Sequence, residues 1–124
     1  MEFLKGPLMP RFLAVYMMKA ENVEAFRALP EEKQDAIDTV GVKLWGEWEA
    51  AHEAAFVDRG AMVGKTLRVA QTGTTPAVNA VCGYVVVRAE TIEAAARIFE
   101  NHPHFALFPG DSVDIMPMVT GPQD

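Results

Sequence analysis

The two most apolar stretches of the chain are apolar on both of their alternating sets of residues, which limits the folds available to it. In residues 12–18, Phe12 and Tyr16 alternate with Leu13 and Val15, so a strand here is buried on both faces. Residues 78–88 repeat this pattern and are rich in β-branched side chains, which favour strands. Both segments are therefore expected to be strands within a sheet that is covered on both sides.

A long helix is expected between these two strands, over residues 30–58. Pro30 needs no hydrogen-bond donor in a first helical turn, and Glu31 complements the helix dipole there. Apolar positions recur at spacings of three and four residues and form one predicted stripe: Ile37, Val40, Leu44, Trp48, Ala51 and Ala55. The sequence Asp58-Arg59-Gly60 is predicted to close the helix.

The remaining elements follow from the same patterns. Residues 62–70 are predicted to form a strand, and residues 71–76, rich in Thr and Gly, a turn. Thr91 is expected to cap a second helix, in which Ile92, Ala95, Ala96 and Phe99 share one face. A loop over 102–109 then leads to a last strand over 112–119.

The resulting order, β-α-β-β-α-β, predicts one α+β domain over residues 1–124 with its core in 12–119. This order is that of the ferredoxin-like fold, an antiparallel sheet with both helices on one face. The other face would expose the second apolar set of the central strands, and soluble monomers seldom expose so large a patch. We therefore expect a homodimer that packs two sheets face to face, a dimeric α/β barrel. The alternative is that a different protein chain covers this face, which requires the additional assumption of a second protein.

Charge and hydropathy exclude several function classes. The net charge is −6 and no cluster of Lys and Arg offsets it, so nucleic acid is not expected as a partner. The apolar segment over residues 3–18 is interrupted by Lys5, Pro7 and Arg11, and no stretch is long enough to span a membrane. A cytoplasmic location is expected. The one cysteine, Cys82, has no partner for an internal disulfide and is expected to pack as a small buried group.

Three stretches carry a resemblance to a known family: residues 57–69 (VDRGAMVGKTLRV), 83–99 (GYVVVRAETIEAAARIF) and 102–118 (HPHFALFPGDSVDIMPM). They resemble the YCII-related family of small dimeric α/β-barrel proteins, and the likeness extends from about Phe12 to Val119. The better-understood members have a proposed dyad of a helix histidine and an aspartate in an Asp-Pro step. Here His102-Pro103 stands at the Asp-Pro position. The resemblance implies isomerase-like or dehydrohalogenase-like chemistry on ring compounds, without a metal or other cofactor.

The segment His102-Pro103-His104 is the most suggestive for chemistry, since imidazoles titrate near neutral pH and two residues apart can project to the same side. The alternative is that His102 satisfies carbonyls at the end of the second helix and His104 packs among the neighbouring aromatic residues. A metal site would need further ligands, and only His52 remains among the histidines. No metal is therefore expected.

On the long helix, Trp45, Glu49 and His52 are spaced four and three residues apart and lie beside Trp48. They are either half-exposed boundary residues or one wall of a cleft, and the family resemblance favours the cleft. In that cleft His102 would be the general acid or base and Glu49 would orient it. His104 would be a second polar contact, and the walls would be Trp45, Trp48 and Tyr16.

Two further alternatives remain open. The sequence from Gly60 to Thr66 resembles a phosphate-binding loop, but it has one residue too few between its glycines and precedes a predicted strand. Nucleotide binding is not expected there. The chain as a whole is either a small-molecule enzyme or a non-catalytic dimeric module that binds a ligand or regulates a partner.

Overall fold

The protein is a mixed α+β chain built on a four-stranded antiparallel sheet, as expected. The computed structural model describes residues 9–119; the first part of the segment examined for a signal peptide and both ends of the predicted domain lie outside this range. The sheet has the order β2-β5-β1-β6. Its strands are β1 (Arg11–Met17), β2 (Phe56–Met62), β5 (Val81–Arg88) and β6 (Ser112–Pro117). The two most apolar segments are thus the two central strands, which confirms that both are strands of one sheet.

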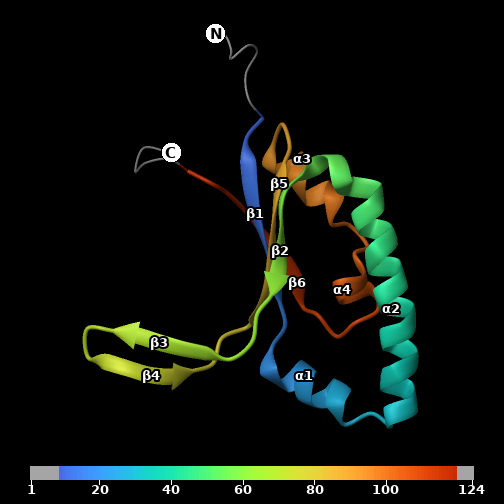
Figure 1. Ribbon diagram of the computed structural model, residues 1–124, viewed down its shortest axis with the longest axis vertical. Coiled ribbons are helices and arrows are strands. Elements are labelled where there is room, and N and C mark those ends of the chain that lie inside the picture. Colours follow the sequence, from blue (N-terminus) through green and yellow to red (C-terminus); the bar gives the residue numbers. More distant parts are fainter. Residues whose placement is uncertain (1–8, 120–124) are drawn as a thin grey trace.

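Helices cover one face of this sheet (Figure 1). The main layer is α2 (Glu31–His52), which continues as a short 3-10 turn, η1 (Glu53–Ala55), together with α3 (Ile92–Ile98). Two further helices, α1 (Ala20–Arg27) and α4 (Pro103–Ala106), lie near one end of the sheet. No helix in the described range is long and apolar enough to cross a membrane.

The core lies between the sheet and α2 with α3. Alternate residues of β1 and β5 point into it, among them Phe12, Tyr16 and Val87, each less than a twentieth exposed. Trp48 from α2 and Phe99, just after α3, pack onto them. Burying a large apolar side chain contributes about 1.5–3 kcal/mol, so this layer holds the helices on the sheet.

Two helix caps illustrate what sequence patterns reveal and what they do not. The Thr91 hydroxyl accepts a hydrogen bond from the amide of Ala94 at 3.0 Å, which confirms the predicted cap. Helix α1 was not predicted. Its first turn is held by Asp111, which accepts bonds from the amide of Lys19 at 2.6 Å and from the side chain of Asn22 at 2.8 Å. This cap comes from a segment distant in sequence.

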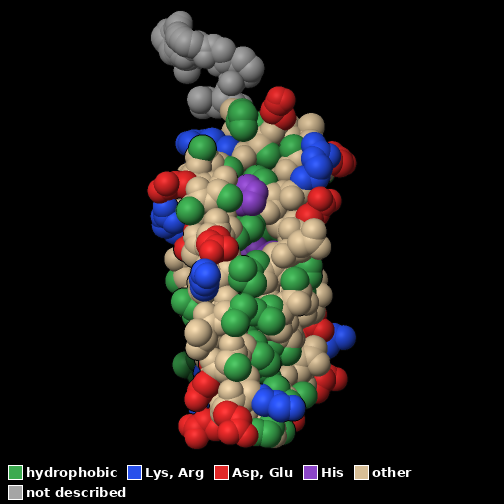
Figure 2. Space-filling model, turned by 90° about the vertical axis from the view of Figure 1, so that its right-hand side faces the viewer, with side chains coloured by type: hydrophobic (Ala, Val, Ile, Leu, Met, Phe, Trp, Pro, Cys, Tyr) green, Lys and Arg blue, Asp and Glu red, His purple; other side chains and the backbone are tan. Residues whose placement is uncertain are grey.

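The buried side of α2 differs from the predicted stripe. The helix ends at His52 rather than near residue 58, and its buried residues are Gly41 and Trp48. Val40 and Leu44 are 48% and 39% exposed, and Figure 2 shows apolar side chains gathered on this side of the molecule. The helix therefore has apolar residues on two sides. The side with the indole rings packs on the sheet because large aromatic side chains bury the most apolar area.

The predicted strand over 62–70 is confirmed only over residues 66–70, which form β3 outside the four-stranded sheet. Residues 58–60 do not close a helix but belong to β2, where Gly60 adopts φ 66°. The chain then leaves the sheet and forms a separate hairpin of β3 (Thr66–Ala70) and β4 (Gly73–Ala77), so the predicted turn over 71–76 is largely a strand. This hairpin projects away from α2, on the side of the sheet that α2 does not cover (Figure 1). β5 consequently begins at Val81, later than predicted.

Candidate functional site

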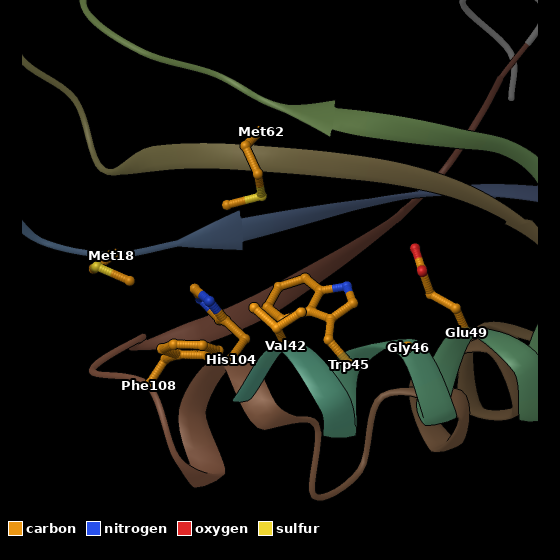
Figure 3. Close-up of a pocket in the computed structure, with 8 residues that line it drawn as sticks. All are labelled: Met18, Val42, Trp45, Gly46, Glu49, Met62, His104 and Phe108. Carbon is orange, nitrogen blue, oxygen red and sulfur yellow. The ribbon is translucent and has the colours of Figure 1, made fainter. Parts of the chain in front are cut away.

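A cavity of about 470 Å³ lies between α2 and the sheet. Its lining is almost entirely apolar, with one carboxylate from Glu49 and one imidazole from His104. In Figure 3, Val42, Trp45 and Glu49 rise from α2, with Met62 on the opposite side and His104 and Phe108 together at one end. The complete lining is Met18, Val42, Trp45, Gly46, Glu49, Met62, His104 and Phe108. Its size is that of a small-molecule site, since such clefts span roughly 300–1,000 Å³.

A second cavity of about 230 Å³ adjoins the first, because both are lined by Trp45, Glu49 and Met62. It reaches deeper toward the sheet, where Tyr16 of β1 and Trp48 line it. Arg59, which pairs with Glu53 at 2.9 Å, lies at its surface side. Glu49 thus lines both cavities.

The indole rings of Trp45 and Trp48 are held by one backbone hydrogen bond and by packing against other aromatic side chains. The Trp48 Nε1–H donates to the carbonyl of Ile98 at 2.8 Å, which joins α2 to α3. His52 donates from Nδ1 to the carbonyl of Trp48, one helical turn earlier, at 3.0 Å. Trp45 packs against Tyr16 with ring centroids 5.1 Å apart. These contacts fix the aromatic walls that the sequence predicted from helix spacing.

His102 lies behind the walls rather than in them. It is fully buried, lines neither cavity, and its ring centroid is 4.4 Å from that of Trp45 and 4.3 Å from that of Trp48. It is the N-cap of α4: Pro103 begins that helix, and His102 Nδ1 accepts a bond from the amide of His104 at 2.9 Å. Burial, together with smaller contributions from His104 and His52, lowers the pKa of His102 to about 3.

His104 reaches the end of the larger cavity but is also bonded to the protein. Its Nε2–H donates to the carbonyl of Met17 at 2.9 Å, and the side chain is 1% exposed. Burial lowers the pKa of His104, against the opposing effects of hydrogen bonds to the backbone of Met17 and Ser112 and of the charge on Asp111. Near pH 7 it is a neutral wall residue of the cavity.

The structure brings most of the predicted site residues together. Trp45, Glu49 and His104 line the larger cavity, and Tyr16, Trp45, Trp48 and Glu49 line the smaller one. His102 and Glu49 form no hydrogen bond within residues 9–119. His102 bonds instead to Tyr16, whose hydroxyl oxygen is 3.3 Å from its Nε2.

Sequence reasoning missed the residues that close the cavity from the sheet side and from its end, Met62 and Phe108. Met62 was unrecognised because its place depends on the register of β2, and Phe108 because it follows α4, which was expected to be part of a loop. Phe108 lies against Gly41, where any β-carbon would be 2.1 Å from its ring. An isolated glycine on the buried side of a predicted helix was the one available signal for this close approach.

The other candidate sites considered from the sequence lack the features that their functions require. In the described range, no three His, Cys, Asp or Glu side chains gather in a way that would hold a metal ion. Gly64 and Lys65 lie between β2 and β3, with no helix after them, which differs from a phosphate-binding loop. The Cys82 thiol donates to the carbonyl of Tyr16 at 3.3 Å, and burial raises its pKa, which disfavours the reactive thiolate.

No family model matches this chain, and no curated protein matches its sequence. The cavities and their residues are therefore the basis for assigning a function.

Proposed function

We propose that this chain is a small-molecule enzyme of the YCII-related type that performs acid-base chemistry on an apolar or cyclic ligand. The observation that carries the proposal is one carboxylate, Glu49, in a cavity of about 470 Å³ that is otherwise almost wholly apolar. Glu49 has no hydrogen bond or ion pair in the described part of the chain. An unpaired carboxylate beside apolar walls is the arrangement in which a general base acts.

The proposed roles differ from those expected from the sequence. Glu49 would be the base that contacts the ligand, and Trp45 and Met62 would hold the ligand between them. His102 would act through Tyr16 rather than directly, because it lies behind the walls and is already bonded at both ring nitrogens. His104 would be a neutral contact at the end of the cavity.

The fold and assembly are part of the same proposal. The order β2-β5-β1-β6, with helices on one face, supports a ferredoxin-like fold. The face of the sheet that the helices do not cover carries Leu13 and Met116, which pair across β1 and β6, and Met116 is 42% exposed. This face would bind a second copy of the chain. The projecting hairpin also supports a partner, since Leu67 and Val69 are 65% and 78% exposed and an isolated two-stranded hairpin is marginally stable.

Ligand binding is tested with Nile red, a neutral apolar dye whose emission rises out of water. We expect enhanced emission with the protein and its loss in the Gly46→Phe variant, because Gly46 lines the cavity and has open space at its β-carbon position. The matched control is Gly64→Phe, which also has open space but lies outside the cavity. Emission that Gly46→Phe does not reduce would contradict binding in this cavity.

Catalysis is tested with a β,γ-unsaturated cyclohexenone, by following its conversion to the conjugated isomer. A positioned base contributes about 10²–10⁴-fold to proton transfer, so Glu49→Gln should remove most of the rate. A Glu47→Gln variant is the control, since Glu47 is exposed on the same helix and lines neither cavity. Equal rates in the two variants would remove Glu49 from the mechanism.

The alternative is a non-catalytic binding module. The observation that favours it is the complete bonding of His102 within the protein, which leaves no free imidazole for chemistry. Nile red binding without any isomerisation of the ketone, or of related carbonyl compounds, would select this alternative.

A further inference from the structure

The pair formed by Tyr16 and His102 determines which group can donate a proton into the smaller cavity. The two side chains are buried, 3% and 0% exposed, and Tyr16 Oη lies 3.3 Å from His102 Nε2. A hydroxyl can donate or accept, and so can a neutral imidazole nitrogen, depending on the tautomer. The distance alone therefore leaves the direction of this bond open.

The backbone of His104 fixes that direction. Its amide lies 2.9 Å from His102 Nδ1, and an amide N–H can only donate, so Nδ1 must be the unprotonated nitrogen of the ring. The ring is neutral near pH 7, since burial lowers the pKa of His102 to about 3. A neutral ring with a bare Nδ1 carries its hydrogen on Nε2. His102 therefore donates, and the Tyr16 oxygen accepts.

The proton of the Tyr16 hydroxyl is then left for another acceptor. Within residues 9–119, Tyr16 Oη has no other hydrogen-bond partner. Tyr16 lines the cavity of about 230 Å³ together with Glu49, and no hydrogen bond joins the two. Burial and the nearby Glu49 carboxylate both raise the pKa of Tyr16, so the phenol keeps its proton near neutral pH. A tyrosine with a free hydroxyl proton and a carboxylate side chain thus line the same small space.

We propose that Tyr16 and Glu49 form a donor-acceptor pair that selects neutral ligands bearing an oxygen atom, such as enols and phenols, with His102 as the residue that positions Tyr16. The ligand oxygen would accept a hydrogen bond from Tyr16, and its own O–H would donate to Glu49. An anionic ligand is disfavoured, because the Glu49 carboxylate faces the same space. This inference rests on the proposed function, since it requires that the cavities admit a ligand.

The tautomer is tested on the unmodified protein. Heteronuclear NMR of the imidazole nitrogens near neutral pH should show His102 with a protonated Nε2 and a bare Nδ1. A proton on Nδ1, or a charged ring, would reverse or remove the bond to Tyr16 and overturn the inference. This measurement needs no substitution and is independent of whether a ligand binds.

The ligand class is tested with para-nitrophenol, whose phenolate is yellow and whose neutral form is not. We expect binding of the neutral phenol, seen as a loss of the yellow absorbance, and about tenfold weaker binding of para-nitroanisole, which cannot donate to Glu49. A protein that binds Nile red but not para-nitrophenol would overturn the ligand class and leave the proposed function standing. A protein that binds neither dye would refute the proposed function itself.

Two variants test whether His102 positions Tyr16 for the ligand or only stabilises the fold. Tyr16→Phe should weaken para-nitrophenol binding about tenfold more than it weakens Nile red binding, because one hydrogen bond is lost. His102→Phe should have a similar selective effect in the wild-type background and no further selective effect in the Tyr16→Phe background. Equal losses for both dyes, or additive losses in the double variant, would assign these residues to structure only.

Discussion

The imidazole of His102 packs edge-on against the indole of Trp45, with ring planes at 87° and centroids 4.4 Å apart. Trp45 also lines both cavities. One ring therefore contacts the proposed ligand space on one side and a fully buried histidine on the other. The protonation state of His102 therefore depends on its burial in the core. Trp45 is the side chain that lies between this histidine and the cavities.

We expect the free energy of unfolding to fall as the pH is lowered. The pKa of His102 is about 3 in the folded chain and near 6.5 when exposed. The unfolded chain therefore binds a proton that the folded chain does not, so this contribution is complete above about pH 6.5 and declines toward pH 3. Between about pH 7 and pH 5 the loss from His102 should be about 2 kcal/mol. Chemical denaturation at both pH values measures it.

The His102→Gln variant is the control for that experiment, since glutamine does not titrate. Other groups, including His104, contribute equally to both proteins. The wild type should therefore lose about 2 kcal/mol more than the variant over this range. Parallel losses would show that His102 takes up its proton over the same pH range in the folded and unfolded chains.

Two glycines of α2 should respond in opposite directions to alanine. A β-carbon on Gly41 would lie 2.1 Å from the Phe108 ring, whereas one on Gly46 meets nothing within 4 Å. Alanine is preferred over glycine inside helices by about 1 kcal/mol, so Gly46→Ala should stabilise the protein. Gly41→Ala gains the same preference but forces Phe108 to move, at about 1–3 kcal/mol.

Urea denaturation of the two variants gives this comparison directly. Gly41→Ala should be the less stable by about 1–3 kcal/mol. Equal stabilities would mean that Phe108 moves away at no cost, which would contradict its role as a fixed wall of the cavity.

A second glycine pair tests the register of β2. Gly60 has φ 66°, and a β-carbon there would lie 1.8 Å from the carbonyl oxygen of Tyr84, while Gly64 has open space. The backbone of β5 cannot yield without loss of its pairing with β2, so Gly60→Ala should cost more than about 3 kcal/mol or prevent folding. Gly64→Ala should change the stability by less than about 0.5 kcal/mol. Thermal unfolding of both variants checks this, and a mild effect at Gly60 would place β2 in another register.

The sequence predicted elements that depend on local patterns. The central strands were recognised from their apolar residues on both faces, and the cap at Thr91 from its residue type. The start of α1 depends on Asp111, a residue 92 positions after Lys19, and no local pattern contains that contact. The strand β2 was missed because Gly60 reads as a helix end, although it serves a close approach to Tyr84.

The candidate site was also predicted only in part. Spacing along one helix was enough to place Trp45 and Glu49 on the same wall. The position of His102 behind that wall depends on α4, whose first turn it caps through its own side chain. The direction of its bond to Tyr16 depends on a backbone amide. Such geometry exists only once the chain has folded, so residue types alone suggested the wrong partner for His102.

The proposed homodimer makes Met116 and Val40 an informative pair of substitutions. They are 42% and 48% exposed in the single chain, so a charge at either site should leave the fold intact. Met116 is paired with Leu13 on the open face of the sheet, and Val40 lies on α2. An apolar sheet contact should bury well over about 1,000 Å², and a charge within it costs several kcal/mol.

We expect sedimentation at micromolar concentration to show a dimer for the wild type and for Val40→Glu, and a monomer of 13.6 kDa for Met116→Glu. The physical reason is that an unpaired carboxylate is tolerated in water beside α2 but not between two apolar sheets. Circular dichroism of each variant verifies that the fold is retained. A monomeric wild type would end the dimer proposal. Dissociation by Val40→Glu with a dimeric Met116→Glu would move the interface from the sheet to α2.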